Sequence, residues 1–134
     1  MASHEPVVVD ASAYIDALTT ATPGHRVVER LRHRRMHAPA HLDAEVLSAL
    51  ARLQRAGVLT DRQVAARLRH VAAAPITRHP VGPLLAGAWK RRHTIRMVDA
   101  LYVELSDRLG GIPLVTTDRR LAKVVSNADV IGFA

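Results

Sequence analysis

The chain has no cysteine among its 134 residues, which excludes disulfide frameworks, thiol nucleophiles and zinc sites built on cysteine. Aromatic residues make up only 3%, too few for the base-stacking sheets of RNA-recognition-motif and OB-type proteins, so any nucleic acid is expected to be held through its phosphates. No apolar run approaches the roughly 18–20 residues that span a bilayer, and the N-terminus lacks the pattern of a secretory signal. We therefore expect no membrane segment and a cytoplasmic location.

Acidic residues and lysine are both scarce, and arginine dominates the charge. Lys and Arg together number 19 against 12 Asp and Glu, which gives a net charge of +7, and the only lysines are Lys90 and Lys123. A chain this basic attracts polyanions such as nucleic acid. The arginine fork fits both phosphate and carboxylate groups, so either kind of anion is an expected partner.

Apolar residues make up 49% of the chain, enough for a buried core, and the length predicts one domain over residues 1–134. Short apolar runs such as Val7–Val9 are typical of buried parallel strands. Strands are predicted at 7–9, 36–38, 75–78, 114–117 and 130–131. Helices are predicted at 12–18, 22–34, 41–56, 60–73, 83–93, 98–109 and 121–125. This alternation predicts an α/β fold, a three-layer α/β/α sandwich around a mostly parallel sheet.

Four acidic residues stand where such a fold places functional sites. Asp10 and Asp118 each follow one of the two clearest strands, and parallel sheets form their sites beyond the carboxyl ends of strands. Glu45 and Asp99 come early in two helices, and each of the four alone is explained as a helix cap or a dipole partner. Gathered in one cleft, carboxylates ~4 Å apart would repel by about 4 kcal/mol per pair. A divalent cation offsets that repulsion, and oxygen ligands favour Mg²⁺, with Mn²⁺ as a substitute.

Four segments carry these acidic residues: VVVDASAYIDAL (7–18), HLDAEVLSAL (41–50), TIRMVDALYVELSDRLG (94–110) and PLVTTDRRLA (113–122). In them the chain resembles the PIN-domain ribonucleases, most closely the VapC toxins of bacterial toxin–antitoxin pairs. The resemblance covers nearly the whole chain. It implies a Mg²⁺-dependent endoribonuclease with the PIN α/β/α sandwich, which forms a homodimer and acts on RNA. It also implies a cognate antitoxin protein that inhibits the enzyme by inserting a segment into the active-site groove.

The resemblance also implies a role for each acidic residue. Asp10 and Asp99 are expected to be the principal metal ligands, with Asp118 a further ligand, direct or through water. Glu45 is expected to orient or deprotonate the attacking water, whereas its neighbour Asp43 faces elsewhere. Hydroxyls that support the carboxylates in the family match Ser12 and Thr116, although a helix-start serine and a strand threonine are equally ordinary.

Basic residues flank two of these acids and are expected to contact RNA phosphates. They are Arg91, Arg92 and Arg96 before Asp99, and Arg119 and Arg120 after Asp118. Arg119 or Arg120 can equally pair with the acidic residues. The histidines, His41 among them, are interpreted as surface residues because no zinc-binding spacing is present, and Trp89 and Tyr102 as packing residues.

Two alternatives remain open from the sequence. A phospho-acceptor receiver domain is also an α/β protein with an acidic Mg²⁺ pocket, but it normally has paired acids after its first strand, whereas Ala11 follows Asp10. A PIN-like module that binds without catalysis is the other alternative. The complete set of four acidic residues favours the enzyme over both.

Overall fold

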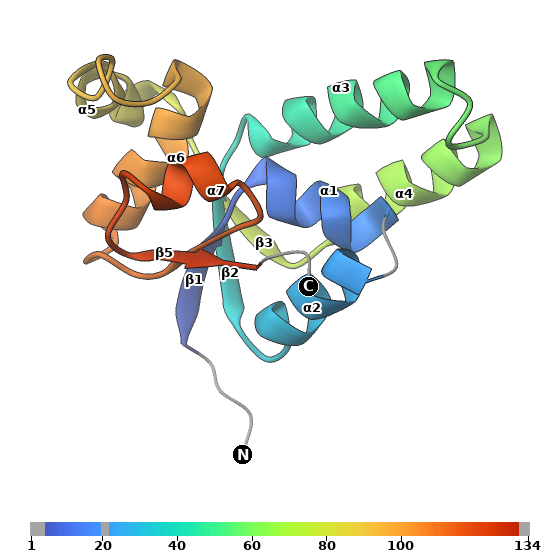
Figure 1. The fold of residues 1–134 in the computed structure, drawn as a ribbon, viewed down its shortest axis with the longest axis horizontal. Helices are drawn as coiled ribbons and strands as arrows, with labels where there is room; N and C mark the ends of the chain where they lie inside the picture. The colour runs from blue at the N-terminus through green and yellow to red at the C-terminus, as the bar shows by residue number, and fades with distance from the viewer. Residues whose placement is uncertain (1–4, 20–21, 132–134) are drawn as a thin grey trace.

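The computed structural model describes residues 5–19 and 22–131. Its centre is a five-stranded sheet with the order β3-β2-β1-β4-β5. The strands are β1 (Pro6–Val9), β2 (Arg35–Pro39), β3 (Ile76–His79), β4 (Leu114–Thr116) and β5 (Ala128–Val130). Every neighbouring pair within this described sheet is parallel. The carboxyl ends of the strands therefore lie along one edge of the sheet (Figure 1).

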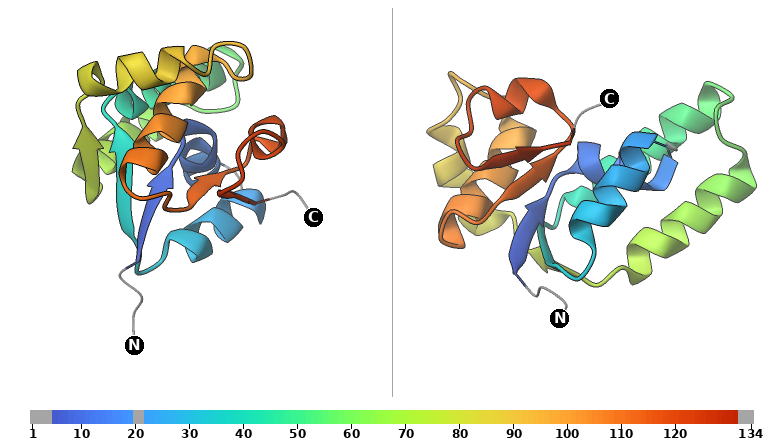
Figure 2. Two further views of the ribbon diagram at one scale, coloured as in Figure 1. Left: turned by 90° about the vertical axis from the view of Figure 1, so that its left-hand side faces the viewer. Right: turned by 60° about the horizontal axis from the view of Figure 1, so that its bottom comes forward.

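Helices cover both faces of the sheet. They are α1 (Ala11–Thr19), α2 (Thr22–Leu31), α3 (Leu42–Arg55), α4 (Asp61–Ala73), α5 (Leu85–Trp89), α6 (Met97–Arg108) and α7 (Arg119–Ala122), with a 3₁₀ turn η1 (Gly82–Leu84) before α5. Figures 1 and 2 show α1 and α2 on one side of the sheet and α5 and α6 on the other. Helices α3 and α4 form an antiparallel pair that extends away from the sheet beside α1. The predicted α/β/α fold is confirmed.

The central strands are buried on both faces, as their unbroken apolar sequence predicts. Val8, Val9, Leu114 and Val115 have no exposed surface. Burying each such side chain stabilises the fold by about 1.5–3 kcal/mol. Strands β1 and β4 thus form a rigid base for the residues that follow them.

Two predicted helices end earlier than their sequence pattern suggests. Helix α2 ends at Leu31 rather than at 34, and the chain then turns through His33, which has a φ of 61°. The helix predicted at 83–93 is reduced to η1 and α5, followed by a series of turns. Within those turns the Arg91 side chain bonds Glu104 and Asp107 of α6, so tertiary ion pairs prevail over local helix propensity here.

The last two elements also begin before their predicted positions. Helix α7 starts at Arg119 rather than at 121, because the Asp118 carboxylate caps it by accepting a bond of 2.9 Å from the backbone N–H of Arg120. Strand β5 covers 128–130 rather than 130–131 and pairs with β4. The predicted capping box of Thr60 and Gln63 at the start of α4 is confirmed.

Candidate functional site

All four predicted acidic residues line one pocket of about 190 Å³ at the carboxyl edge of the sheet. Asp10 follows β1 directly and Asp118 comes two residues after β4. Glu45 and Asp99 lie in the first turns of α3 and α6. The fold therefore brings together side chains that are up to 108 positions apart in the sequence. The other residues that line the pocket are Ala11, Ser12, Ile15, Arg52, Arg96 and Tyr102.

Asp10 is the most deeply buried of these acids, with 4% of its surface exposed. Its Oδ1 accepts hydrogen bonds from the Ser12 hydroxyl at 2.8 Å and from the backbone N–H of Ala13 at 2.9 Å. Burial raises the pKa of Asp10 to about 6, although hydrogen bonds from Thr116, Ala13 and Ser12 work in the opposite direction. Those donors are all neutral. The ionised carboxylate of Asp10 therefore lacks a strong positive partner in this arrangement.

Asp99 and Asp118 have partners that are weak and accessible to solvent. The Arg96 Nε lies 3.0 Å from Asp99 Oδ2, and the Arg120 Nε lies 3.4 Å from Asp118 Oδ1. These arginine side chains are 66% and 80% exposed, and exposed ion pairs of this kind contribute about 0–1 kcal/mol. Within residues 5–19 and 22–131, no three histidines or acids stand close enough to hold a metal ion as they are placed. A shared cation would have to draw Asp99 and Asp118 away from their arginines.

Glu45 is held by two groups that the sequence pattern did not connect with it. The Tyr102 hydroxyl donates to Glu45 Oε1 at 2.6 Å, and the His41 Nε2 lies 3.2 Å from the same oxygen. Burial alone would raise the pKa of Glu45, but these two hydrogen bonds and the charge of Arg96 outweigh it and lower that pKa. Glu45 is therefore an ionised group fixed through Oε1.

From the sequence, Tyr102 is interpreted as a packing residue and His41 as a surface residue. In the structure both side chains also contact Glu45. Tyr102 is 1% exposed, yet its hydroxyl reaches the pocket, and burial together with Glu45 raises its pKa. The His41 ring lies 4.7 Å from the Tyr102 ring, between centroids. Tyr102 is 57 residues from Glu45 along the chain, so no local spacing could have indicated the bond.

Ser12 and Thr116 link the ends of β1 and β4 beneath the acids. Their hydroxyl oxygens are 3.3 Å apart, and Ser12 donates to Asp10. The Thr116 hydroxyl oxygen accepts from the backbone N–H of Asp118 at 2.9 Å. This chain of hydroxyls fixes the spacing between Asp10 and the turn that carries Asp118.

The five predicted RNA-contacting arginines do not all lie at the pocket. Arg96 lines the pocket, and Arg120 shares an adjacent hollow with Arg96, Asp99 and Asp118. Arg119 is exposed at the start of α7. Arg91 is bound to Glu104 and Asp107 further along α6, and Arg92 lies over the Trp89 ring. Arg52 of α3 lines the pocket and was not predicted.

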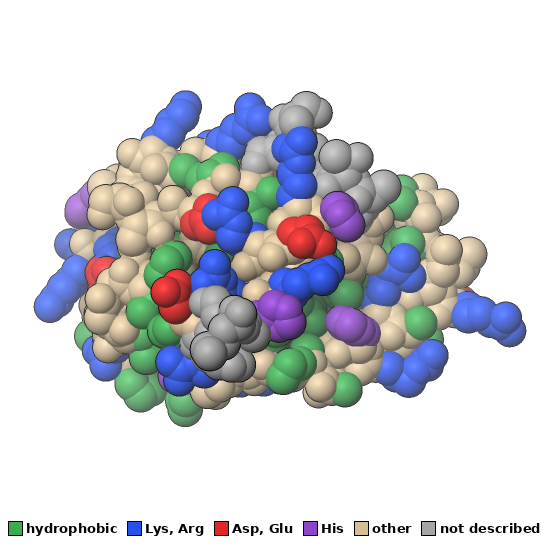
Figure 3. All heavy atoms as spheres, turned by 90° about the horizontal axis from the view of Figure 1, so that it is seen from below, with side chains coloured by type: hydrophobic (Ala, Val, Ile, Leu, Met, Phe, Trp, Pro, Cys, Tyr) green, Lys and Arg blue, Asp and Glu red, His purple; other side chains and the backbone are tan. Residues whose placement is uncertain are grey.

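The opposite edge of the sheet carries mainly basic side chains. Figure 3 shows that face from below, with many Lys and Arg side chains and fewer acidic ones among them. Two of its ion pairs are Arg30 with Asp129 and Arg34 with Glu5.

None of the described helices is both long and apolar enough to cross a membrane.

The fold and the pocket define an α/β protein with an acidic site beyond the carboxyl ends of a parallel sheet. The family model described as PIN domain matches residues 7–126, so the chain belongs to the PIN domain family. This confirms the resemblance found in the sequence and removes the receiver-domain alternative.

Relatives and solved structures agree with that assignment. Ribonuclease VapC3 of Mycobacterium tuberculosis is 54% identical over 129 residues, which cover 96% of this chain and 93% of the relative. Ribonuclease VapC12 of the same organism is 35% identical over 117 residues, covering 87% and 90%. The crystal structure of PAE2754 from Pyrobaculum aerophilum superposes with a TM-score of 0.68 over 98% of this chain and 93% of that one. At 22% identity the last likeness concerns the fold alone.

Proposed function

We propose that the chain is an endoribonuclease toxin that hydrolyses RNA phosphodiester bonds at the acidic pocket with Mg²⁺, in the cytoplasm. The observation that carries this proposal is Asp10: a buried carboxylate with a raised pKa and neutral donors, facing Glu45, Asp99 and Asp118. Acids gathered in one pocket, with partners that are neutral or exposed to solvent, lower the stability of the fold, and such sites persist where a function requires them. Relatives named as ribonucleases, 54% and 35% identical, support the same chemistry.

The residues of the pocket fit a hard divalent cation. All the candidate ligands are carboxylate oxygens, from Asp10 and Asp99 with Asp118 as a further ligand, and this set favours Mg²⁺ or Mn²⁺ over zinc. When bound, such an ion supplies a polarised phosphoryl oxygen and a water molecule that is easily deprotonated. The exposed pairs of Asp99 with Arg96 and of Asp118 with Arg120 are weak enough to exchange.

The remaining side chains divide the other tasks. Glu45 has one oxygen fixed by Tyr102 and His41, and its other oxygen is left to orient or deprotonate the attacking water. Arg96 and Arg120, once released by the carboxylates, become donors for RNA phosphates in the same place. Ser12 and Thr116 keep the carboxylates aligned.

Cleavage of single-stranded RNA by the purified chain tests the proposal. We expect cleavage with Mg²⁺ or Mn²⁺, none in EDTA, and a loss of at least about a thousandfold in Asp10→Asn and Glu45→Gln. Asp43→Asn is the matched control because Asp43 is two residues from Glu45 but bonds Arg78 at 2.8 Å, outside the pocket. Equal cleavage by Asp10→Asn would refute the proposal, and RNA binding without cleavage by the unmodified chain would favour the non-catalytic module.

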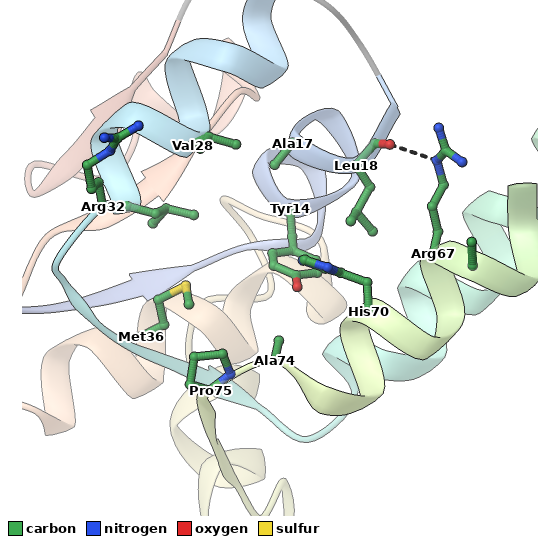
Figure 4. A pocket seen from close by; sticks show the side chains of 12 residues that line it. Tyr14, Ala17, Leu18, Val28, Arg32, Met36, Arg67, His70, Ala74 and Pro75 are labelled. Atoms are coloured by element: carbon green, nitrogen blue, oxygen red, sulfur yellow. Dashed lines mark hydrogen bonds between the residues drawn. The ribbon is translucent and has the colours of Figure 1, made fainter.

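A cognate antitoxin is the proposed protein partner, and an apolar groove away from the acidic pocket suits it. Figure 4 shows this apolar groove of about 520 Å³ between α1, α2 and α4. Apolar side chains such as Leu18, Val28 and Met36 line it, with Arg32, Arg67 and His70 beside them. An amphipathic antitoxin helix with acidic residues along its edge matches this lining. A second segment of the same antitoxin would enter the acidic pocket, as the resemblance implies.

The groove can be tested with two exposed valines. Val28 lines the groove and is 44% exposed, whereas Val58 is 63% exposed at the turn between α3 and α4. Val28→Asp should weaken antitoxin inhibition by tenfold or more, and Val58→Asp should leave it unchanged. Equal inhibition of both variants would place the antitoxin elsewhere.

The homodimer implied by the resemblance stays a separate prediction, and sedimentation of the purified chain would test it.

A further inference from the structure

Trp89, the only tryptophan of the chain, lies on the surface at the end of α5. It is 60% exposed, whereas from the sequence it is interpreted as a residue that packs at a helix–helix contact or a dimer interface. The Arg92 guanidinium carbon lies 4.7 Å from the centroid of its ring, and the Arg92 Nη1 donates to the Trp89 carbonyl at 3.1 Å. A large indole left in water beside a stacked guanidinium is an arrangement that binds planar groups.

The helix that carries Trp89 is held firmly in place. Arg91 bonds Glu104 and Asp107 of α6, and the Arg91 Nη1 also donates to the Gly87 carbonyl at 3.0 Å. A Cβ at Gly87 would lie 2.1 Å from the Glu104 carboxyl carbon, so the two helices are in close contact there. The packing of α5 on α6 therefore fixes the backbone from which the indole projects.

The turns after Trp89 lead directly to the acidic pocket. The backbone N–H groups of Thr94 and Ile95 both donate to the Arg91 carbonyl, and the chain then reaches Arg96. Thr94, Ile95 and Arg96 share a hollow with Asp99 and Asp118. Trp89 and Arg96 are seven positions apart in the chain, which limits the distance between them to about 25 Å. A single strand of RNA several nucleotides long is therefore long enough to reach from Arg96 to the indole.

We propose that Trp89 and Arg92 form a subsite for an unpaired nucleobase of the RNA, outside the acidic pocket and on the chain segment that leads to it. The inference rests on the proposed ribonuclease function and adds a second mode of contact to it. Bases stack on indole rings and on guanidinium planes, and the neighbouring Lys90 and His93 are exposed on the same turn, where a phosphate backbone would pass. The sequence predicted contacts through phosphates alone, whereas one exposed tryptophan is enough for one stacked base.

Charge favours RNA over a second copy of the chain on this surface. Each chain carries a net charge of +7, and a symmetric contact through Trp89 would bring Lys90, Arg92 and His93 of two copies together. Like charges at that spacing repel, whereas a single-stranded polyanion is attracted. The planar, negatively charged partner is thus the better match.

The fluorescence of the single tryptophan reports on this subsite directly. The full chain is titrated in EDTA, which prevents cleavage, with a single-stranded RNA oligonucleotide and with an abasic oligonucleotide of the same length. We expect the RNA to quench Trp89 emission and the abasic strand to bind without comparable quenching. RNA binding with unchanged emission would overturn the proposal. So would a shift of emission with protein concentration alone, because it would place a second copy on the indole.

Matched variants separate stacking from general charge. Trp89→Leu keeps an apolar side chain but removes the ring, and should raise the Kd for RNA by roughly 5- to 150-fold. Trp89→Phe should recover most of the affinity, and Leu85→Ala, at a 56% exposed position of the same helix, should change it less than twofold. All three variants should bind inorganic polyphosphate as the unmodified chain does; a parallel loss there would overturn the proposal.

Cleavage in Mg²⁺ is measured separately on the unmodified chain, so the two proposals can fail independently. Cleavage without quenching in EDTA would refute the stacking subsite alone. Quenching without cleavage under any divalent cation would refute the nuclease and retain a base-binding surface.

Discussion

The acidic residues of helix α6 lie in two different environments. In its second half, Glu104 and Asp107 form an ionic cluster with Arg91 and Arg108, in which each carboxylate is bonded to at least one guanidinium. Burial alone would raise the pKa of Glu104, but the hydrogen bonds from Arg108 and Arg91 outweigh it and lower that pKa. This cluster serves the packing of α5 on α6.

The first turn of α6 faces the acidic pocket. There burial outweighs the hydrogen bonds that favour the ionised form of Asp10. Asp99 accepts hydrogen bonds from the exposed Arg96, and burial leaves Asp10 with a pKa of about 6. Both regions hold partly buried carboxylates within one turn or two of each other, so burial itself does not distinguish them. The difference is whether a guanidinium is fixed on each acid, and it distinguishes the structural cluster from the pocket that we propose to bind a cation.

Asp10→Asn should produce the largest change in stability. Because burial raises the pKa of Asp10 from 3.8 to about 6, the folded chain binds this proton more tightly than the unfolded chain. The ionised form therefore opposes folding, by up to about 3 kcal/mol above pH 6, and this penalty disappears as the pH falls toward 4. In EDTA, we expect the free energy of unfolding of the variant to exceed that of the unmodified chain by about 3 kcal/mol at pH 7.5 and by about half of that at pH 5. Urea unfolding at the two pH values measures this difference.

The same experiment distinguishes the two regions. Glu104→Gln, in the ionic cluster, should lose stability at pH 7.5, because its lowered pKa means that ionised Glu104 favours folding. Adding Mg²⁺ should stabilise the unmodified chain and not Asp10→Asn. A loss of stability in Asp10→Asn at pH 7.5 would show that the pocket is satisfied without a cation.

Gly87→Ala should have the next largest effect, and it breaks the ionic cluster alone. The added Cβ would lie 2.1 Å from the Glu104 carboxyl carbon and must displace that group from Arg91 and Arg108. We expect a loss of about 2 kcal/mol in thermal unfolding experiments. Gly82→Ala is the control, since no atom lies within 4 Å of its added Cβ. Equal stability of the two variants would mean that the cluster rearranges freely.

The sequence predicted the acidic pocket because topology alone brings strand ends together. Asp10 and Asp118 follow β1 and β4, which are neighbours in the sheet, so their proximity needs no side-chain detail. Local signals were also sufficient for the Thr60 capping box. These features depend on residues that are close along the chain or on the order of strands.

What could not be predicted depends on contacts between distant side chains. The bond from Tyr102 to Glu45 joins residues 57 positions apart, and Tyr102 reads as an ordinary core residue in its own helix. Arg91 looks like its neighbour Arg92, yet one is fixed in the ionic cluster and the other lies over an exposed indole. The sequence pattern of a run of arginines does not indicate which of them will form ion pairs and which will lie on the surface.

Tyr102→Phe should have a smaller effect, confined to the pocket. It removes the donor at 2.6 Å from Glu45 Oε1, which helps to keep the pKa of Glu45 low. The pKa of Glu45 should then rise, and the acid limb of the pH–rate profile should move to higher pH with a rate loss of about tenfold. Stability should fall by about 1 kcal/mol. An unchanged acid limb would assign that limb to another group.

Arg120→Gln should have the smallest effect on stability. Arg108→Gln is the variant with which it is compared. Both arginines pair with an acid at the surface, at 3.4 Å and 2.8 Å, and are 80% and 48% exposed. Because such pairs are screened by water, Arg120→Gln should change stability by less than about 0.5 kcal/mol. Beside the pocket, however, Arg120 is the proposed donor to an RNA phosphate, so its loss should reduce the salt dependence of RNA binding by about one unit of slope. Arg108→Gln should leave that slope unchanged, since Arg108 belongs to the ionic cluster. Equal slopes for the two variants would mean that an arginine beside an acid of the pocket is no more available to RNA than one committed to packing.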